Sequence, residues 1–427
     1  MDLSFTSTVL YIFVKNKNMI SKFKYEYLLF FIAIIWVSFF AFVLQFKSPF
    51  LLEGDEVGYL SAAKKIYLNF KVDDARPLFI SLINGFPLLF SSSNFYIYKW
   101  VLLVNLLSWF FTIILVYKIA SQRLNKKTGF FISLIFLFCI GNLAITYKFL
   151  SESVFIFMLV LSIYFLNRYL ISKKYCFLSI TIAVLLLSIL VKPLSMGLVI
   201  LLILFYVKKL KKIIYNKYSI LILFSFGLLF FQMYSLKKEH GNFTISYIDS
   251  FTYYNYLGTR ADCLKNNTEF IQGKNDRYTY FIKLSSFEQR KIANNDLRNQ
   301  LFNNPQNLLK AYFINIYVNS SKGSASVHGC KNYTLNSYFK YFHFIFKLIS
   351  KMQNLFFTIL GIYLCCSFFI KYKKQDLFFL IISVTILYVL FISAISSDQG
   401  DRFHIVIYPL IILLLINTGW LKNKHPV

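Results

Sequence analysis

Long apolar runs separated by short polar segments dominate the chain. Most of them approach or exceed the roughly 20 residues that a helix needs to cross a bilayer. The runs lie at residues 27–46, 98–117, 129–147, 152–170, 176–191, 194–207, 218–236, 346–370, 377–396 and 404–420. The pattern predicts an all-α multi-pass membrane protein with about ten transmembrane helices.

Lys192 and Pro193 separate the fifth run from the sixth. Proline cannot continue the hydrogen-bond ladder of a helix, and it disfavours helix in the residue before it. The alternative is one kinked helix, which would reverse the topology of everything that follows.

The distribution of charge favours two separate spans. With the N-terminus inside, the predicted cytoplasmic pieces hold 21 Lys and Arg against three acids, whereas the outer loops are nearly balanced. Because cytoplasmic loops are enriched in Lys and Arg, we expect both termini in the cytoplasm, including the segment 1–26. The net charge of +28 then belongs mostly to membrane-facing loops, and it indicates no nucleic-acid partner.

Composition supports the same class, since 57% of the residues are hydrophobic and 20% are aromatic. No small-residue cleavage site precedes the first run, and either Met1 or Met19 could be the true start.

A polar stretch at residues 237–345 interrupts the apolar pattern between the membrane parts 27–236 and 346–427. It lies outside under this topology, and it is long enough to form a small domain. Within it, the segment from Ser285 to Leu309 is predicted to be helical, with Ser286 as a cap and Pro305 as a break.

This outer stretch contains two cysteines, Cys263 and Cys330. Two thiols in an oxidising compartment are a candidate disulfide. The sequence contains no Gly-rich phosphate loop, zinc-ligand spacing or nucleophile-elbow motif.

The first outer loop, residues 47–97, carries the most informative polar pattern. Asp55 and Glu56 follow the first apolar run and are flanked by glycines, which let a backbone approach a ligand closely. Such a pair can act as a general base or hold a cation, or it can belong to a solvated loop. The apolar stretch 77–90 is too short to span and is expected to lie along the membrane interface.

Other charged residues fall on the same predicted face. These are Arg76, Glu152, Lys192 and Arg402. Each has a simpler explanation: Glu152 can complement a helix N-terminus, Lys192 can snorkel to the interface, and Arg402 can be a flanking charge. Together, separate acids and cations on one membrane face suit a phosphate-bearing lipid substrate. His343 and His404 are isolated and are expected to be interfacial side chains rather than ligands.

These motifs resemble those of GT-C-type glycosyltransferases, integral-membrane enzymes that take a sugar from a polyprenyl-phosphate donor. The chain is most similar to bacterial relatives of protein mannosyltransferases and of the lipid A aminoarabinose transferase. The residues that carry the resemblance are Gly54, Asp55, Glu56, Tyr59, Ala62, Ala63, Arg76, Pro77, Leu78, Ser151, Glu152, Lys192, Pro193, Arg402 and Pro409. The resemblance covers roughly residues 27–236 and 346–420, and not the outer domain.

The resemblance implies a GT-C-like fold and an inverting transfer, in which Asp55 takes the proton of the acceptor hydroxyl. Glu56 would support Asp55 or contact the sugar. The substrate-binding residues would be Arg76, Glu152, Lys192, Arg402 and Tyr59. No cofactor would be required, although a divalent cation at the acidic pair stays open.

The implied partners are a polyprenyl-phosphate sugar donor, membrane lipids, and a glycan, lipid or protein acceptor. The localisation would be a bacterial plasma membrane, with the active site on its outer face. Two other functions stay open: a polysaccharide polymerase, and a transporter of lipid-linked sugars. A transporter would place polar residues at mid-membrane depth, and a polymerase would favour arginine-rich outer loops. A non-catalytic assembly protein is a third alternative, and it would leave Asp55 without a role.

Overall fold

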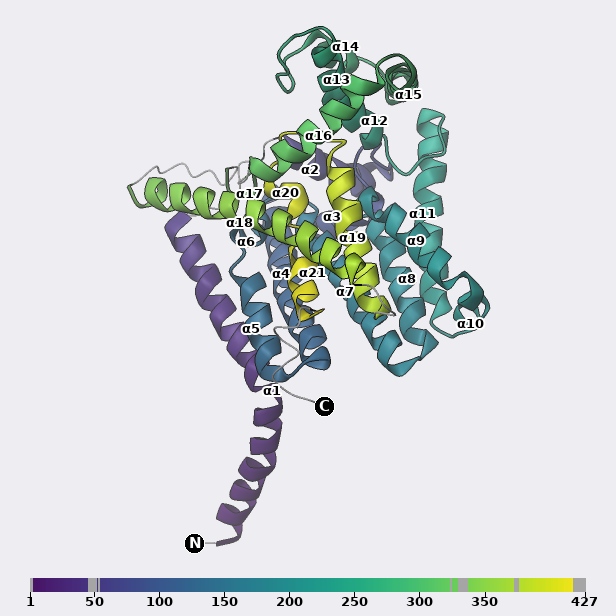
Figure 1. Ribbon diagram of the computed structural model, residues 1–427. Helices are drawn as coiled ribbons and strands as arrows, with labels where there is room; N and C mark the ends of the chain where they lie inside the picture. The colour runs from purple at the N-terminus through teal and green to yellow at the C-terminus, as the bar shows by residue number, and fades with distance from the viewer. Residues whose placement is uncertain are drawn as a thin grey trace.

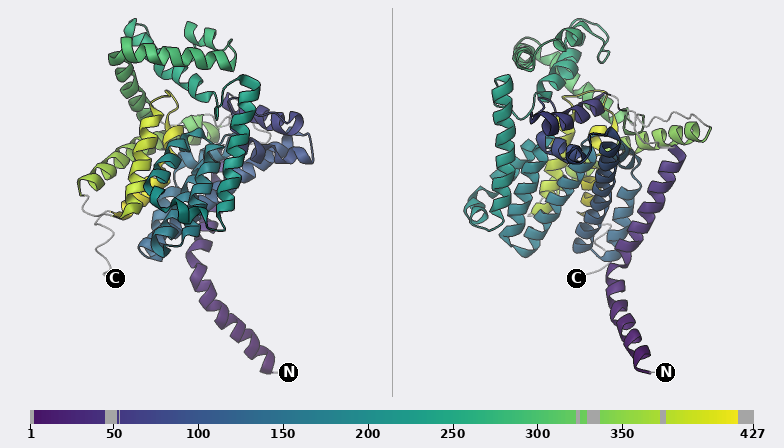
Figure 2. Two further views of the ribbon diagram at one scale, coloured as in Figure 1. Left: turned by 90° about the vertical axis from the view of Figure 1, so that its right-hand side faces the viewer. Right: turned by 180° about the vertical axis from the view of Figure 1, so that it is seen from behind.

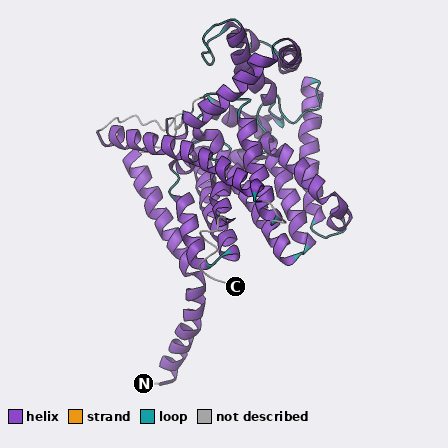
Figure 3. Cartoon of the chain, in the orientation of Figure 1, coloured by secondary structure: helices purple, strands orange, loops and turns teal. Residues whose placement is uncertain are grey.

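The structure is a computed structural model that describes residues 3–44, 52, 54–322, 325–328, 337–371 and 376–417. Within these ranges every regular element is a helix and no strand occurs (Figures 1 and 3). The expected all-α architecture is therefore confirmed.

Six helical segments of the described chain are long and apolar enough to cross a membrane, which is consistent with the expected multi-pass arrangement. They are Lys24–Leu44 in α1 (Leu3–Leu44), α4 (Asn94–Arg123), α7 (Glu152–Ser172), Pro193–Ile214, α11 (Ser219–His240), and Tyr338–Ile370 in α18 (Ser337–Ile370). Three other expected spans are shorter apolar helices: α8 (Tyr175–Ile189), α19 (Leu377–Ser393) and Tyr408–Asn417, which contains α21 (Tyr408–Leu414). The structure therefore supports six or seven spans by length, and ten are not confirmed.

The seventh candidate is a bent pair where one straight span was expected. α5 (Lys126–Leu137) and the segment Ile140–Tyr147, which includes α6 (Ile140–Ala144), meet at 65°. Gln353 of α18 accepts a hydrogen bond from the Ile140 amide at 2.9 Å and donates one to the Phe138 carbonyl at 3.0 Å. The bend is stable because this distant side chain satisfies backbone groups that a straight helix would pair internally.

The predicted break at Lys192 and Pro193 is confirmed. α8 ends at Ile189, and Pro193 begins a 3₁₀ turn, η3 (Pro193–Ser195), that leads into α9 (Met196–Tyr206). The carbonyl of Leu190 accepts a hydrogen bond from the amide of Ile80 at 3.1 Å. Another element thus satisfies a carbonyl at the C-terminal end of α8.

The first outer loop forms two short helices. α2 (Asp55–Asn69) begins at the acidic pair, and α3 (Leu78–Gly85) continues into the 3₁₀ turn η1 (Phe86–Leu89). The stretch expected at the interface is therefore helical, and it exposes Leu89 and Phe90.

The polar stretch forms a cluster of helices at one end of the bundle, opposite the projecting N-terminal half of α1 (Figures 1 and 2). These outer helices are α12 (Ile248–Thr252), the π-helical turn η5 (Tyr253–Gly258), α13 (Thr259–Lys265), α14 (Asp276–Phe281), α15 (Ser286–Asn303) and α16 (Pro305–Ser321). They have their own apolar core, in which Tyr254 stacks on Phe281 with ring centroids 4.3 Å apart. α16 connects this core to α18 and α19.

The start of α15 corrects one expectation. The cap is Ser285 rather than Ser286, because Ser285 is extended and its hydroxyl accepts the Glu288 amide while Glu288 bonds back to the cap. This reciprocal arrangement is a capping box. Pro305 ends the helical stretch as predicted, since α16 begins there as a new helix.

α1 and α18 both extend beyond the spans expected for them, into the predicted segments 1–26 and 237–345. At about 1.5 Å per residue, the 33 residues from Tyr338 to Ile370 are longer than a membrane is thick. α18 accordingly crosses the face of the bundle obliquely (Figure 1).

Candidate active site

The structure brings the predicted charged residues together at the outer-helix end of the bundle. Asp55 is the first residue of α2, Arg76 lies in the loop before α3, and Glu152 begins α7. Lys192 lies at the break after α8, and Arg402 lies in the short helix α20 (Asp401–His404). We call these five residues the charge cluster.

Arg402 is the centre of the charge cluster. Its Nη1 lies 2.6 Å from Oδ2 of Asp55, and its Nε lies 2.7 Å from Oε1 of Glu152. One guanidinium thus joins two carboxylates that are 97 residues apart in sequence, because its fork of donors can serve two partners at once.

Each carboxylate has a second cation. Nη2 of Arg76 lies 2.7 Å from Oδ1 of Asp55, and Nζ of Lys192 lies 3.0 Å from Oε1 of Glu152. Three cations therefore face two carboxylates, and the charge cluster has an excess of positive charge.

Glu152 is fully buried, whereas the side chain of Asp55 is 40% exposed. The second oxygen of Glu152, Oε2, is buried and has no hydrogen-bond partner among the residues that the structure describes. Asp55 is the carboxylate of the pair that a bound molecule can reach from outside.

Electrostatics keeps Asp55 ionised. Burial raises the pKa of Asp55, but the charges of Arg402 and Arg76 outweigh it and hold the pKa well below its ordinary value of 3.8. The carboxylates in turn raise the pKa of Arg402 against the effect of burial. For Lys192 burial prevails, and its pKa is lowered.

Tyr59 lies beside the charge cluster, one turn after Asp55 on α2. Its hydroxyl is 2.8 Å from that of Ser151, the residue before Glu152, and the Arg76 guanidinium lies 4.7 Å from its ring centroid. Tyr59 therefore stabilises the position of Arg76 through a cation–π contact. Glu56 is buried on the same helix.

Asp73 positions Arg76 and was not singled out from the sequence. Its Oδ1 accepts the amides of Ala75 and Arg76 at 3.0 and 2.9 Å, and its Oδ2 is paired with Lys65 at 2.6 Å. The sequence could have indicated this turn, because aspartate side chains commonly accept the amides of residues two and three positions later.

The outer helices reach the charge cluster through a second group that the sequence did not indicate. The hydroxyl of Tyr256 accepts hydrogen bonds from Gln272 at 3.0 Å and from Gln399 at 3.4 Å. Oε1 of Gln399 in turn accepts one from Nη1 of Arg402 at 3.4 Å. A tyrosine of the outer helices is thus linked through one side chain to the central arginine.

Asp401, next to Arg402, is fully buried and has a structural environment. Its Oδ1 accepts the Ser326 amide at 2.9 Å, and its Oδ2 accepts the hydroxyls of Ser326 and Ser350. His404 is also buried, within 3.2 Å of Thr358, Asn354 and Ser393. Its expected place at the membrane interface is wrong, since it lies in a polar network between helices.

Cys330 lies outside the described residues, so its pairing with Cys263 stays a prediction.

A divalent cation at Asp55 and Glu56 also stays an open question. Across the described part of the chain, no group of three or more His, Cys, Asp or Glu side chains could hold a metal ion.

Comparisons with protein-family models, curated proteins and solved structures give no match for this chain.

Proposed function

We propose that the protein is a membrane glycosyltransferase that moves a sugar from a polyprenyl-phosphate donor to an acceptor. The observation that carries the proposal is the bridge that Arg402 makes between Asp55 and Glu152. It places three cations and a reachable carboxylate at one end of a membrane-helix bundle. A phosphate ester at the membrane surface is a substrate that such a group is suited to bind.

In the proposed reaction the acceptor hydroxyl loses its proton to Asp55 while its oxygen attacks the anomeric carbon. The bond from that carbon to the phosphate oxygen breaks, and the polyprenyl phosphate leaves. Arg76, Arg402 and Lys192 stabilise the negative charge on the leaving phosphate. Glu152 holds Arg402 and Lys192 in place, and Glu56 supports Asp55.

Before the donor binds, Asp55 is a weak base because Arg76 and Arg402 neutralise it. A donor phosphate competes for the same two guanidiniums. As they turn towards the phosphate, the pKa of Asp55 rises and its basicity increases. The donor itself would thus activate the base.

The proposed location is a bacterial plasma membrane, with both termini in the cytoplasm and the charge cluster on the outer face. The outer helices would then contact the acceptor, and Tyr256 links them to Arg402 through Gln399. The bias of Lys and Arg towards the other end supports this orientation.

Transfer of radiolabelled sugar from polyprenyl-phosphate donors tests the proposal, in membranes that hold equal amounts of the intact protein, Asp55→Asn or Asp276→Asn. Asp276 is an exposed acid of α14 and serves as the matched control. We expect loss of transfer in Asp55→Asn alone, and a chelator added to the intact protein shows whether a divalent ion takes part.

Equal transfer by Asp55→Asn would remove Asp55 from the mechanism. No transfer by the intact protein with any donor would contradict the proposal and favour the polymerase or the transporter.

A further inference from the structure

A second group of cations surrounds a cavity at the opposite end of the bundle from the charge cluster. The cavity has a volume of about 480 Å³, within the usual range of small-molecule sites. Its lining includes Arg123, Tyr169, Lys173, Tyr206, Lys209 and Asp376. α7 has 21 residues between Glu152 and this end, about 31 Å, so the two groups lie a membrane thickness apart.

Positive charge exceeds negative charge around this cavity, with three cations against one carboxylate. Arg123 is paired with Asp376, donates to Asn167 at 2.7 Å, and lies 4.0 Å from the ring centroid of Phe378. These contacts hold Arg123 in place in the wall of the cavity. Lys173 and Lys209 are exposed and supply charge that no ion pair among the described residues neutralises.

A buried hydroxyl also lines the cavity. Tyr206 is only 2% exposed, and within the described part of the chain its hydroxyl has no hydrogen-bond partner. Such a group usually has a partner, because burial of a hydroxyl without one is unfavourable. The neighbouring Tyr169 hydroxyl accepts from Lys209 at 3.2 Å, so Lys209 is already turned towards the two tyrosines.

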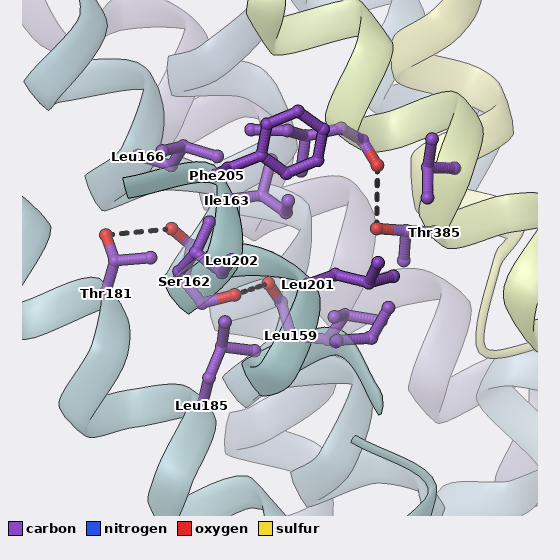
Figure 4. Close-up of a pocket in the computed structure, with 13 residues that line it drawn as sticks. Leu159, Ser162, Ile163, Leu166, Thr181, Leu185, Leu201, Leu202, Phe205 and Thr385 are labelled. Atoms are coloured by element: carbon purple, nitrogen blue, oxygen red, sulfur yellow. Dashed lines mark hydrogen bonds between the residues drawn. The ribbon is translucent and has the colours of Figure 1, made fainter. Parts of the chain in front are cut away.

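An apolar pocket lies one helical turn deeper along the same three helical segments. It takes Leu166 from α7, Leu202 from α9 and Ile381 from α19, whereas the cationic cavity takes Tyr169, Tyr206 and Leu377 from the same segments. Figure 4 shows its side chains converging from these helices.

The hydroxyls of this pocket are already used. Those of Ser162 and Thr385 donate to carbonyls of their own helices at 2.7 Å. With a volume of about 30 Å³, close to that of one water, the pocket can take part of a hydrocarbon chain but cannot enclose one.

We propose that this end of the bundle binds the phosphate group of an anionic lipid, with Lys173, Lys209 and the Tyr206 hydroxyl as ligands. The lipid tail would lie along the groove formed by α7, α9 and α19. Phosphate oxygens accept hydrogen bonds from ammonium and phenol groups, and a tail would use the apolar pocket that lies one turn deeper on the same helices. The proposal is independent of the proposed transfer reaction and of the charge cluster.

Native mass spectrometry of the intact protein in detergent tests the proposal, by counting bound molecules during titration with phosphatidylglycerol, diacylglycerol or inorganic phosphate. The double variant Lys173→Met/Lys209→Met should bind phosphatidylglycerol at least about tenfold more weakly. Its matched control is Lys211→Met/Lys217→Met, which removes two lysines of the same basic end from outside the cavity. The control should bind like the intact protein.

Tyr206→Phe separates binding from folding. It removes a hydroxyl that has no partner among the described residues, so the lipid-free Tm should stay the same or rise while phosphatidylglycerol binding weakens several-fold. Val384→Phe, which fills the apolar pocket, should weaken binding of the lipid and leave binding of inorganic phosphate unchanged.

Equal binding of phosphatidylglycerol by the intact protein and the Lys173/Lys209 double variant would overturn the site, since the lysines would then only complement helix C-termini. Equal binding of diacylglycerol and phosphatidylglycerol would overturn the phosphate contact. Inorganic phosphate that binds as tightly as phosphatidylglycerol would support the phosphate contact and overturn the tail groove.

Discussion

At the scale of single residues, Arg402 has the largest energetic role in the charge cluster. It contacts Asp55 and Glu152 together, and Glu152 has no exposed surface. Because a buried carboxylate that loses a cation keeps its desolvation cost, removal of Arg402 affects stability as well as chemistry.

Arg402→Gln should destabilise the protein by about 3 kcal/mol. This value is at the lower end of the range for breaking a buried ion pair, because Lys192 still contacts Glu152. The measurement is the Tm of the purified protein in detergent. Arg298→Gln, which removes an exposed arginine of α15, is the matched control and should change stability by less than about 0.5 kcal/mol. The double variant Arg402→Gln/Glu152→Gln should recover part of the loss. Equal Tm values for Arg402→Gln and Arg298→Gln would contradict this reasoning.

The low pKa of Asp55 predicts the pH dependence of the proposed reaction. Since kcat/KM reports groups of the free enzyme, and Asp55 stays ionised below its ordinary pKa of 3.8, Asp55 should cause no fall between about pH 8 and pH 5. Arg76→Gln removes one of the two guanidiniums that lower this pKa, so it should move the acid limb upwards. The measurement is kcat/KM for sugar transfer from about pH 8 down to about pH 3.5, so that the acid limb itself falls within the range. A fall in kcat/KM near pH 6 that is seen in the intact protein but not in Arg76→Gln would contradict this prediction.

The members of the charge cluster could be predicted from the sequence, but the residues that position them, Asp73 and Tyr256, were not predicted. Asp55, Glu152, Lys192 and Arg402 are conspicuous because charges beside apolar runs are costly, and helix packing alone brings them to one end. Tyr256 depends on packing between segments 143 residues apart, to which no local pattern corresponds. Asp73 differs, because its turn depends only on the amides of Ala75 and Arg76 and is therefore local in the sequence.

At the scale of elements, breaks in helices determine where polar groups lie. The break at Pro193 could be predicted because proline has a local effect. The bend between α5 and α6 contains no proline, and it depends on Gln353 of α18. The hydrophobic period therefore predicted that each apolar run is helical, but not which runs bend or are too short to span.

α6 packs so closely against its neighbours that glycine is required at its second residue. A Cβ at Gly141 would lie 2.9 Å from Asp401 Oδ2 and 3.1 Å from Ser326 Oγ. Gly141→Ala should therefore destabilise the protein by about 1–3 kcal/mol, because the buried Asp401 network would have to move. Thermal unfolding in detergent measures the effect.

Gly227→Ala is the control, because a Cβ at this position of α11 meets nothing within 4 Å. It should leave stability unchanged or raise it by up to about 1 kcal/mol, since alanine favours helix. If Gly141→Ala proved as harmless as Gly227→Ala, the close approach of α6 to Asp401 would be wrong.

At the scale of the whole molecule, the two groups of cations differ in how they are balanced. The charge cluster pairs three cations with two carboxylates, whereas lysines at the opposite end are exposed and outnumber acids. This asymmetry is the basis for the proposed orientation, because basic residues remain on the cytoplasmic side during insertion.

Labelling from one side of the membrane tests the orientation. In a background with all native cysteines replaced by serine, Lys274→Cys lies among the outer helices and Lys174→Cys lies at the basic end, and both positions are exposed. A membrane-impermeant maleimide added to intact cells should label Lys274→Cys only, and permeabilised cells should show labelling of both. Labelling of Lys174→Cys alone in intact cells would invert the topology. The charge cluster would then face the cytoplasm, where nucleotide sugars are available, and a donor on the outer leaflet would no longer explain why acids and cations gather at that end.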